Sequence, residues 1–262
     1  VAYNGRASSV HITGCDIRRP TGQIFDQDSG TVKFELTRKL DFELELGTVI
    51  GGSLPVGETL DFEEAENLIF GYVLLNDWSA RDIQSWEYQP LGPFLSKSFG
   101  TSISHWIITP EALEPFKRKA PERKFPLFPH FEDDKAFVFD ISLNVTLIEE
   151  DGSETEISRT NSKELYYSPV QQVIHHSSGG CGISTGDLMG SGTISGTEKG
   201  TFGCMLELSW GGRDKIVLSS GKQRDFLEDN DTIVFKGSAM ENDFTIGFGS
   251  CSGRIVKIIG EK

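Results

Sequence analysis

The sequence contains no long apolar run and few basic residues. None of its apolar stretches approaches the roughly 18 residues that a membrane-spanning helix needs, so no membrane span is predicted. Lys and Arg number 25 against 39 Asp and Glu, which gives a formal net charge of −14. Because nucleic-acid binding depends on a basic surface, this charge argues against a nucleic-acid partner. It leaves an anionic substrate open, since a local cation can reverse the field inside a cleft.

Cysteine is also sparse, with four residues and no Cys-x-x-Cys pair. The four are Cys15, Cys181, Cys204 and Cys251. Their spacing fits neither a disulfide framework nor a zinc site. Scattered thiols are typical of a reducing compartment, so a cytoplasmic location is expected. Each thiol is expected to be a small, buried, apolar side chain.

The remaining composition is typical of a globular protein with many turns. Hydrophobic residues make up 37% and charged residues 24% of the chain, which argues against disorder. The 29 glycines indicate frequent turns. Alternation and capping signals predict helices over residues 61–68, 80–88 and 168–176. Strands are predicted over 40–46, 69–76, 137–147, 204–210, 216–218, 232–236, 244–248 and 254–259. Many short strands with few helices indicate a β-dominated α+β domain.

Three acidic residues alternate with apolar ones in the predicted strand Leu40–Leu46. Alternation places Asp41, Glu43 and Glu45 on one face, with neighbours roughly 6.5 to 7 Å apart. Two arrangements relieve the repulsion between them: exposure to water, or a hard cation such as calcium or magnesium, which prefers carboxylate oxygens. The strand alone leaves both open.

A second polar group follows the apolar stretch at residues 69–76. Asp77 is expected to cap the next helix at the positive end of its dipole. On that helix Arg81, Gln84 and Tyr88 share one face. A cation, an amide and a phenol suit recognition of a carbonyl or carboxylate compound. A polar surface stripe is the alternative.

Three further candidates lie in loops and on a predicted strand. Lys97 lies among small residues in the Gly-containing stretch 90–102, where it can approach an anion. Thr193 lies in the flexible run GSGTISG at 190–196. Glu207 is expected to face away from the apolar residues of the predicted strand 204–210. For each of the three, an ordinary surface role is the alternative.

Several segments together resemble the fumarylacetoacetase family. They are NDWSARDIQSWEYQPLGPFLSKSFGTS at 76–102, LDFELEL before it, and GSGTISG and GCMLELSW after it. The resemblance runs from YNGRASS at 3–9 to IGFGSCSG at 246–253 and so covers nearly the whole chain. Broader relatives such as acylpyruvate hydrolases share the metal carboxylates but lack the continuous WEYQPLGPFLSKSFGTS and the HHSSGGCG segment.

The resemblance implies a fold and a reaction. Residues 1–262 would form a catalytic domain of mixed β-roll type, preceded in the family by a small SH3-like domain, in a cytosolic homodimer. The implied reaction hydrolyses the carbon–carbon bond of 4-fumarylacetoacetate, a β-diketone acid. Its products are fumarate and acetoacetate, at the last step of tyrosine and phenylalanine breakdown.

The resemblance also implies roles for single residues. Glu43, Glu45 and Asp77 match ligands of a calcium or magnesium ion, and Lys97 and Thr101 match positions beside that metal. Arg81, Gln84 and Lys97 match groups that stabilise the oxyanion and the carbanion. Gln84, Tyr88 and Thr193 match substrate contacts, with Tyr3 as a further candidate. Glu207 matches the carboxylate that orients the catalytic histidine. Asp41 matches no ligand, so another partner is expected for it.

The sequence departs from the family at its start. The family's base histidine and one more metal-binding aspartate correspond to positions upstream of Val1, and none of the five histidines here matches that base. We therefore expect the 262-residue chain alone to be inactive or nearly so. Three alternatives stay open: another β-diketone or acylpyruvate hydrolase, a β-keto acid decarboxylase, or a non-catalytic fragment stabilised by metal.

Overall fold

Two mixed five-stranded sheets form the body of the protein, for which a computed structural model describes residues 2–256. The first sheet has the order β1 (Val10–Ile12), β9 (Thr101–Ile103), β7 (Ile69–Asp77), β6 (Leu44–Ile50) and β14 (Leu188–Gly190). The second has the order β13 (Glu154–Asn161), β12 (Ser142–Ile148), β17 (Thr232–Glu241), β18 (Phe244–Val256) and β2 (Cys15–Arg18). The pairs β1–β9 and β18–β2 are parallel, and the other pairs are antiparallel.

Two-stranded ribbons and short helices surround these sheets. The ribbons pair β3 (Thr21–Asp26) with β4 (Thr31–Leu36), β5 (Leu40–Asp41) with β8 (Ser79–Ala80), β10 (Lys117–Lys119) with β11 (Phe137–Phe139), and β15 (Ile216–Val217) with β16 (Gln223–Arg224). The α-helices are α1 (Phe62–Leu68), α2 (Arg81–Glu87), α3 (Pro110–Leu113), α4 (Pro169–Ser177) and α5 (Met205–Leu208). Short 3-10 turns are η1 (Ala7–Ser9), η2 (Glu114–Phe116), η3 (Pro129–Phe131), η4 (Asp133–Lys135) and η5 (Ser162–Glu164). The predicted β-dominated α+β fold of mixed β-roll type is confirmed.

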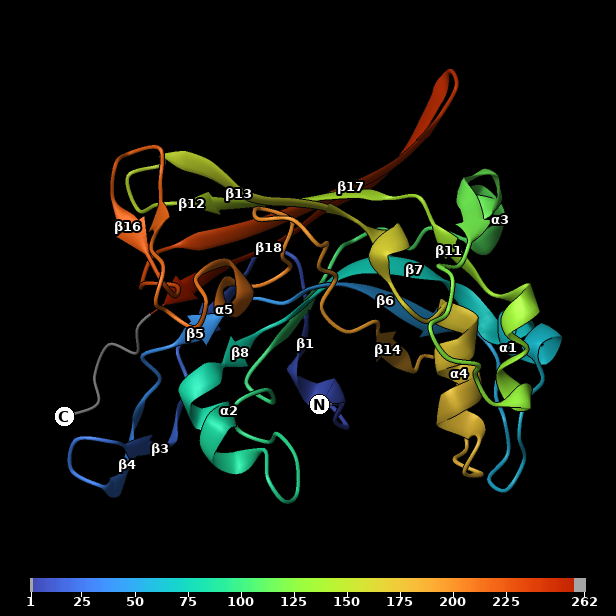
Figure 1. Ribbon diagram of the computed structural model, residues 1–262, viewed down its shortest axis with the longest axis horizontal. Helices are drawn as coiled ribbons and strands as arrows, with labels where there is room; N and C mark the ends of the chain where they lie inside the picture. Colours follow the sequence, from blue (N-terminus) through green and yellow to red (C-terminus); the bar gives the residue numbers. More distant parts are fainter. Residues whose placement is uncertain (1, 257–262) are drawn as a thin grey trace.

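The main core lies between the two sheets. The Phe42 ring meets Phe235 of β17 edge-on at 5.6 Å, and Tyr72 of β7 meets Phe139 at 5.0 Å. A methyl group added to Gly237 would lie 2.9 Å from a Leu74 methyl, so glycine is needed where β17 crosses β7. Figure 1 shows α1 and α4 together at one end, and α2 beside the β3–β4 hairpin at the other. The acidic strand ends therefore lie beside a well-packed core.

Local signals account for the helices that the sequence predicts. Asp61 and Glu64 form a capping box that starts α1, and Ser168 and Gln171 do the same for α4, with Pro169 in its first turn. The longest helix in residues 2–256 has nine residues, and no helix in this range is long and apolar enough to cross a membrane.

Some predicted elements differ from the structure. The acidic strand 40–46 is divided into β5 and β6, with Phe42 and Glu43 between them. Asp77 ends β7 and does not cap α2, whose N-cap is Ala80, because the short strand β8 intervenes. Strands predicted at 244–248 and 254–259 are one strand, β18, and residues 257–259 lie outside the described part.

The prediction of a strand at 204–210 is wrong, because this segment contains the helical turn α5. Met205 and Leu208, three residues apart, are both buried, while Leu206 is 38% exposed. That spacing fits one helical turn better than alternation. Trp210 then adopts a φ of 49°, and two glycines with positive φ follow it, which ends the helix.

The cysteines behave as predicted only in part. Cys204 and Cys251 are buried, and burial raises the pKa of Cys251 to about 12. Cys15 and Cys181 are exposed, so the expectation of burial is wrong for these two. All four are free thiols.

Candidate active site

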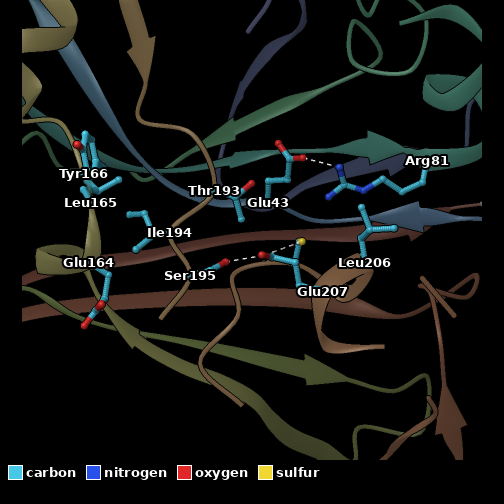
Figure 2. Close-up of a pocket in the computed structure, with 11 residues that line it drawn as sticks. Glu43, Arg81, Glu164, Leu165, Tyr166, Thr193, Ile194, Ser195, Leu206 and Glu207 are labelled. Carbon is cyan, nitrogen blue, oxygen red and sulfur yellow. Dashed lines mark hydrogen bonds and ion pairs between the residues drawn. The ribbon is translucent and has the colours of Figure 1, made fainter. Parts of the chain in front are cut away.

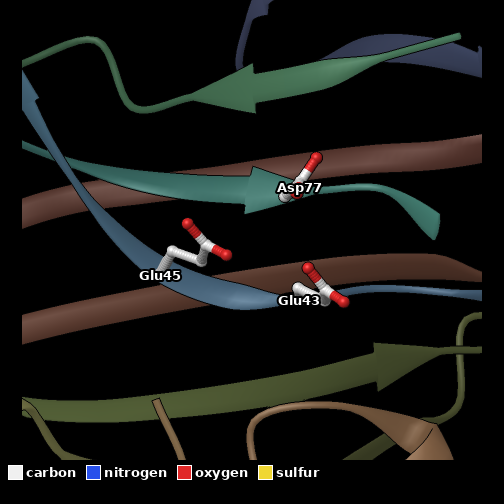
Figure 3. A group of neighbouring side chains, drawn as sticks. All are labelled: Glu43, Glu45 and Asp77. Carbon is white, nitrogen blue, oxygen red and sulfur yellow. The ribbon is translucent and has the colours of Figure 1, made fainter. Parts of the chain in front are cut away.

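Three carboxylates from two adjacent strands meet at one end of the first sheet (Figure 3). Glu45 lies in β6, Glu43 directly precedes β6, and Asp77 is the last residue of β7. The Asp77 amide donates to the Glu43 carbonyl at 3.2 Å, which fixes the two strand ends together. One oxygen from each of the three carboxylates lies within 4.8 Å of the others, and all three residues are buried. Because all three residues are buried, exposure to water does not relieve the repulsion between their carboxylates.

Two side chains from elsewhere in the chain reach this carboxylate triad, which we define as Glu43, Glu45 and Asp77. Lys97 Nζ lies 2.5 Å from Glu43 Oε2 and 2.8 Å from Asp77 Oδ2. It also donates to Ser79 Oγ at 2.7 Å. The Tyr3 hydroxyl donates to Asp77 Oδ1 at 2.5 Å. The lysine therefore compensates two of the three carboxylates.

The charges in the site shift its pKa values in opposite directions. Burial opposes ionisation of Glu43, but the positive charges of Lys97 and Arg81 outweigh it and lower the Glu43 pKa. Burial likewise opposes the charged form of Lys97, but Asp77 and Glu43 raise its pKa. For Glu45, burial and then the negative charges of Asp77 and Glu43 raise the pKa well above its usual range. Lys97 thus stays protonated, whereas Glu45 is costly to ionise.

The residues present suit a divalent cation. Glu45 is 4% exposed, and its hydrogen-bond partner among the described residues is the amide of Gly192, at 3.1 Å from Oε2. A buried carboxylate beside two others, with no cationic side chain of its own, needs additional positive charge to ionise. Three convergent carboxylate oxygens are the donor type that hard cations such as calcium and magnesium prefer.

Arg81 forms a second charged centre beside the triad. Its Nε lies 2.8 Å from Asp41 Oδ2, and its Nη1 lies 2.6 Å from Glu43 Oε1. Nη1 also donates to Gln84 Oε1 at 3.2 Å. The third nitrogen, Nη2, is buried and has no hydrogen-bond partner within residues 2–256. A buried donor without a partner is costly, so Nη2 is available for a ligand atom.

A pocket of about 490 Å³ opens beside Arg81 and Glu43 (Figure 2). Thr193, Ser195 and Glu207 contribute its polar groups. Glu207 Oε2 accepts hydrogen bonds from Ser195 Oγ at 2.5 Å and from Cys204 Sγ at 3.3 Å. The other lining residues are Glu164, Leu165, Tyr166, Ile194, Cys204 and Leu206. The pocket therefore combines an unpaired guanidinium nitrogen, a carboxylate and an apolar wall, which suits a small organic acid.

A family model described as fumarylacetoacetate (FAA) hydrolase C-terminal matches residues 1–256. The chain belongs to the fumarylacetoacetate hydrolase family. Curated fumarylacetoacetases from Arabidopsis thaliana and Homo sapiens are 46% and 45% identical over 257 residues. The match covers 98% of this chain and 61% of each relative, so the chain spans about three fifths of their length.

Solved structures of the fumarylacetoacetate hydrolase family share the fold. A fumarylacetoacetate hydrolase from Exiguobacterium antarcticum has a TM-score of 0.60 at 20% identity, over 98% of this chain and 66% of that one. A fumarylpyruvate hydrolase from Pseudomonas aeruginosa, in complex with Mn²⁺ and pyruvate, has a TM-score of 0.55 at 17% identity. Its alignment covers 95% of this chain and 74% of the other.

The structure brings most of the sequence-predicted residues of this family member together. The triad, Lys97, Arg81 and Gln84 form one contiguous group, and Thr193 and Glu207 line the adjoining pocket. Thr101 pairs directly with Asp77 across β9 and β7. Tyr88 is the C-cap residue of α2 and does not line the pocket. Glu207 reaches the pocket from a helix and not from the predicted strand.

Sequence analysis missed several groups that support the site. Ser79 holds the Lys97 ammonium, and Ser195 and Cys204 hold the Glu207 carboxylate. Tyr3 was only a candidate contact for substrate, but its hydroxyl binds Asp77. The sequence does contain a signal for Ser195, because this residue lies two positions after Thr193 in the same glycine-containing run. Ser79 and Cys204 had none beyond proximity in sequence to Asp77 and Glu207.

Gly190 provides the space for the Glu45 carboxylate. A methyl group at Gly190 would overlap Glu45 Oε2. We therefore expect Gly190→Ala to displace one ligand and weaken calcium or magnesium binding by about 10- to 100-fold, measured by isothermal titration. Gly179→Ala, where the added methyl meets open space, is the control and should bind as the wild type does. Unchanged affinity in Gly190→Ala would remove Glu45 from the ligand set.

Stabilisation by a cation should increase with pH. The raised pKa of Glu45 means that the metal-free fold favours the protonated acid. The contribution of Glu45 to the free energy of unfolding therefore falls as the pH rises above 4.5, the ordinary pKa of a glutamate. An ion must displace that proton, so affinity should rise up to about tenfold per pH unit while Glu45 titrates. The calcium-induced increase in Tm should be larger at pH 8 than at pH 5.5 by calorimetry. Equal increases at both pH values would contradict this assignment.

Proposed function

We propose that the protein to which this chain belongs hydrolyses the carbon–carbon bond of 4-fumarylacetoacetate, releasing fumarate and acetoacetate. The observation that carries the proposal is the carboxylate triad with Lys97 and Arg81 on either side of Glu43. The curated fumarylacetoacetases that are 44–47% identical over 98% of this chain support the substrate assignment. The product fumarate would place the reaction at the end of tyrosine breakdown.

Glu43, Glu45 and Asp77 would hold a divalent cation, calcium or magnesium in this proposal. Thr101, which pairs with Asp77 across β9 and β7, would offer its hydroxyl as a further hard oxygen donor. Lys97 would lie beside the ion without being a ligand, because a protonated ammonium has no lone pair to donate. When bound, the ion supplies Lewis acidity toward a carbonyl oxygen of the β-diketone. The Mn²⁺ and pyruvate in the Pseudomonas aeruginosa fumarylpyruvate hydrolase structure support this assignment.

The residues of this chain would stabilise charge as the bond breaks. A base takes a proton from water, and the resulting hydroxide adds to the substrate carbonyl carbon. Arg81 Nη2, buried and unpaired, donates to the oxygen that becomes negative. The Gln84 amide nitrogen is available to donate beside it, since its oxygen is held by Arg81.

Cleavage of the carbon–carbon bond then produces a carbanion, which needs a positive charge beside it and a proton. The electron pair of the carbon–carbon bond moves to the acetoacetate fragment as an enolate, which must gain a proton to give acetoacetate. Lys97 would be the source of positive charge beside that enolate, because its carboxylate neighbours raise its pKa and keep it protonated. The proton that completes acetoacetate would come from the protonated base, which is thereby restored. Thr193, which lines the pocket, would contact the substrate, whereas Tyr88 lies outside the pocket lining and stays a prediction from the sequence.

Glu207 would orient the histidine that acts as the base. Within residues 2–256, the side-chain partners of Glu207 are Ser195 and Cys204, and no histidine contacts it. The described residues therefore do not supply the histidine that Glu207 would orient. The cytosol and a homodimer are the location and assembly that we propose for the complete enzyme.

The proposed function is tested by substrate comparison. The longest polypeptide that carries these 262 residues should hydrolyse 4-fumarylacetoacetate in preference to an acylpyruvate of similar length, measured by loss of diketone absorbance. A preference for acylpyruvate, or release of carbon dioxide from a β-keto acid, would replace the proposed substrate. Absence of all three reactions with cation bound would identify a non-catalytic module.

A further inference from the structure

Asp41 is the most buried acid near the site and belongs neither to the carboxylate triad nor to the pocket lining. Its exposed fraction is 0%, and its carboxylate receives hydrogen bonds from four nitrogen atoms. Oδ1 accepts from the amides of Phe42 at 2.8 Å and Met205 at 2.7 Å. Oδ2 accepts from the Leu206 amide at 2.9 Å and from Arg81 Nε at 2.8 Å. Both oxygens are therefore fully used by the protein, so Asp41 is not a free ligand for a cation.

Two of these bonds fix the start of α5. The first amides of a helix have no partner within the helix, and a side chain at the N-cap usually satisfies them. Cys204, the N-cap residue of α5, makes no such side-chain bond. Asp41, 164 residues earlier, binds the first two amides of the turn instead. Glu207 follows Leu206 directly, so the position of its carboxylate depends on this long-range cap.

The remaining side-chain bond fixes the guanidinium plane of Arg81. Asp41 binds Nε and Glu43 binds Nη1, which leaves Nη2 as the free nitrogen. Two carboxylates on two nitrogens of a planar group define its orientation more strongly than either does alone. Without Asp41 the guanidinium would be held through Nη1 alone, by Glu43 and Gln84, and could rotate about these contacts and change the direction of Nη2.

We infer that Asp41 is a positioning residue that fixes Arg81 and the Glu207-bearing turn α5 relative to each other. A single carboxylate thereby joins the oxyanion-stabilising group and the group that orients the base, which come from separate segments of the chain. The inference rests on the proposed function for its catalytic consequence. Its structural part, that one side chain anchors both segments, can be tested without activity.

The test compares Asp41→Asn with Asp231→Asn. Asp231 is also buried, accepts two bonds from Arg224 at 3.0 and 3.1 Å and one from the Glu228 amide, and does not line the pocket. In Asp41→Asn the side-chain NH2 group, which cannot accept a hydrogen bond, would face one pair of donors. That pair is either Arg81 and Leu206 or Phe42 and Met205. Asp41→Asn should lower kcat on 4-fumarylacetoacetate by about 100-fold, with KM changed less than about threefold. Asp231→Asn should lower Tm but leave kcat within about twofold of the wild type.

Two further measurements separate positioning from simple loss of stability. Amide exchange at Met205 and Leu206 should accelerate in Asp41→Asn and not in Asp231→Asn. The loss in the double variant Asp41→Asn/Arg81→Met should fall well short of the product of the two single losses, because Asp41 acts through Arg81.

The outcomes distinguish this inference from the proposed function. Wild-type kcat in Asp41→Asn, or equal losses of kcat in both Asn variants, would overturn the inference. If the wild-type form of the longest polypeptide that carries these 262 residues does not act on 4-fumarylacetoacetate, the function is overturned. The exchange data would still decide whether Asp41 anchors both segments. If Asp41→Asn does not fold, the Arg81 Nε–H signal of the wild type decides. Slow exchange supports the inference, and exchange as fast as that of an exposed arginine contradicts it.

Discussion

Replacing Lys97 with methionine is expected to lower the free energy of unfolding by about 3–5 kcal/mol in the absence of divalent cations. Lys97 is 3% exposed and binds Glu43 and Asp77, so its removal leaves three buried carboxylates without this ammonium. Methionine fills similar volume, which keeps the loss of packing small. Urea unfolding in a chelating buffer measures the change.

Calcium or magnesium should recover part of that loss. A cation bound to the triad compensates the same carboxylates, and its stabilisation grows with its concentration relative to Kd. Lys33→Met is the control, because Lys33 forms an exposed pair with Asp26 and its loss should leave the free energy of unfolding nearly unchanged. If Lys97→Met costs no more than Lys33→Met, the carboxylates do not depend on the lysine. If cations do not stabilise the variant, the triad is not a metal site.

Replacing Arg81 with methionine should reduce kcat on 4-fumarylacetoacetate by about 100- to 1000-fold. The reason is loss of Nη2, a buried nitrogen of a residue that lines the pocket, which has no hydrogen-bond partner within residues 2–256. Steady-state kinetics on the longest polypeptide that carries the chain measures the effect. Arg81→Met will also destabilise the fold, because Asp41 and Glu43 lose a partner.

A matched variant separates these two effects. Arg224 is similarly buried and pairs with Asp231, so Arg224→Met should cause a comparable loss of stability. Since Arg224 does not line the pocket, its kcat should stay near that of the wild type. Comparable losses of kcat in both variants would show that stability, and not charge placement, explains the result for Arg81.

The sequence predicts the parts of the site that depend on local pattern. Alternation in residues 40–46 placed Glu43 and Glu45 on one face, and the apolar stretch before Asp77 predicted the end of a strand there. The resemblance to the family joined the three residues, and the direct pairing of β6 with β7 brings them together. Helical spacing likewise placed Arg81 beside Gln84. The same reasoning failed for residues 204–210, where alternation over so few residues does not distinguish a strand from one helical turn.

The parts that the sequence could not predict depend on contacts between distant segments. Tyr3 and Asp77 are separated by 74 residues, and Asp41 and Met205 by 164. Asp41 had the same local pattern as Glu43 and Glu45, yet its carboxylate binds Arg81 and α5 and is not part of the triad. Whether an acid of this strand binds a cation or an arginine depends on which segments pack against it, and local periodicity carries no information on that.

In the proposed site, Glu43, Glu45 and Asp77 together bind one divalent cation. Anomalous diffraction from crystals of the 262-residue chain soaked in Mn²⁺ tests it most directly, because Mn²⁺ accepts the same oxygen ligands as magnesium and scatters anomalously. We predict a single strong peak between the three carboxylates, which is lost in Glu45→Gln. Full Mn²⁺ occupancy at other sites, with no peak at these carboxylates, would contradict the claim.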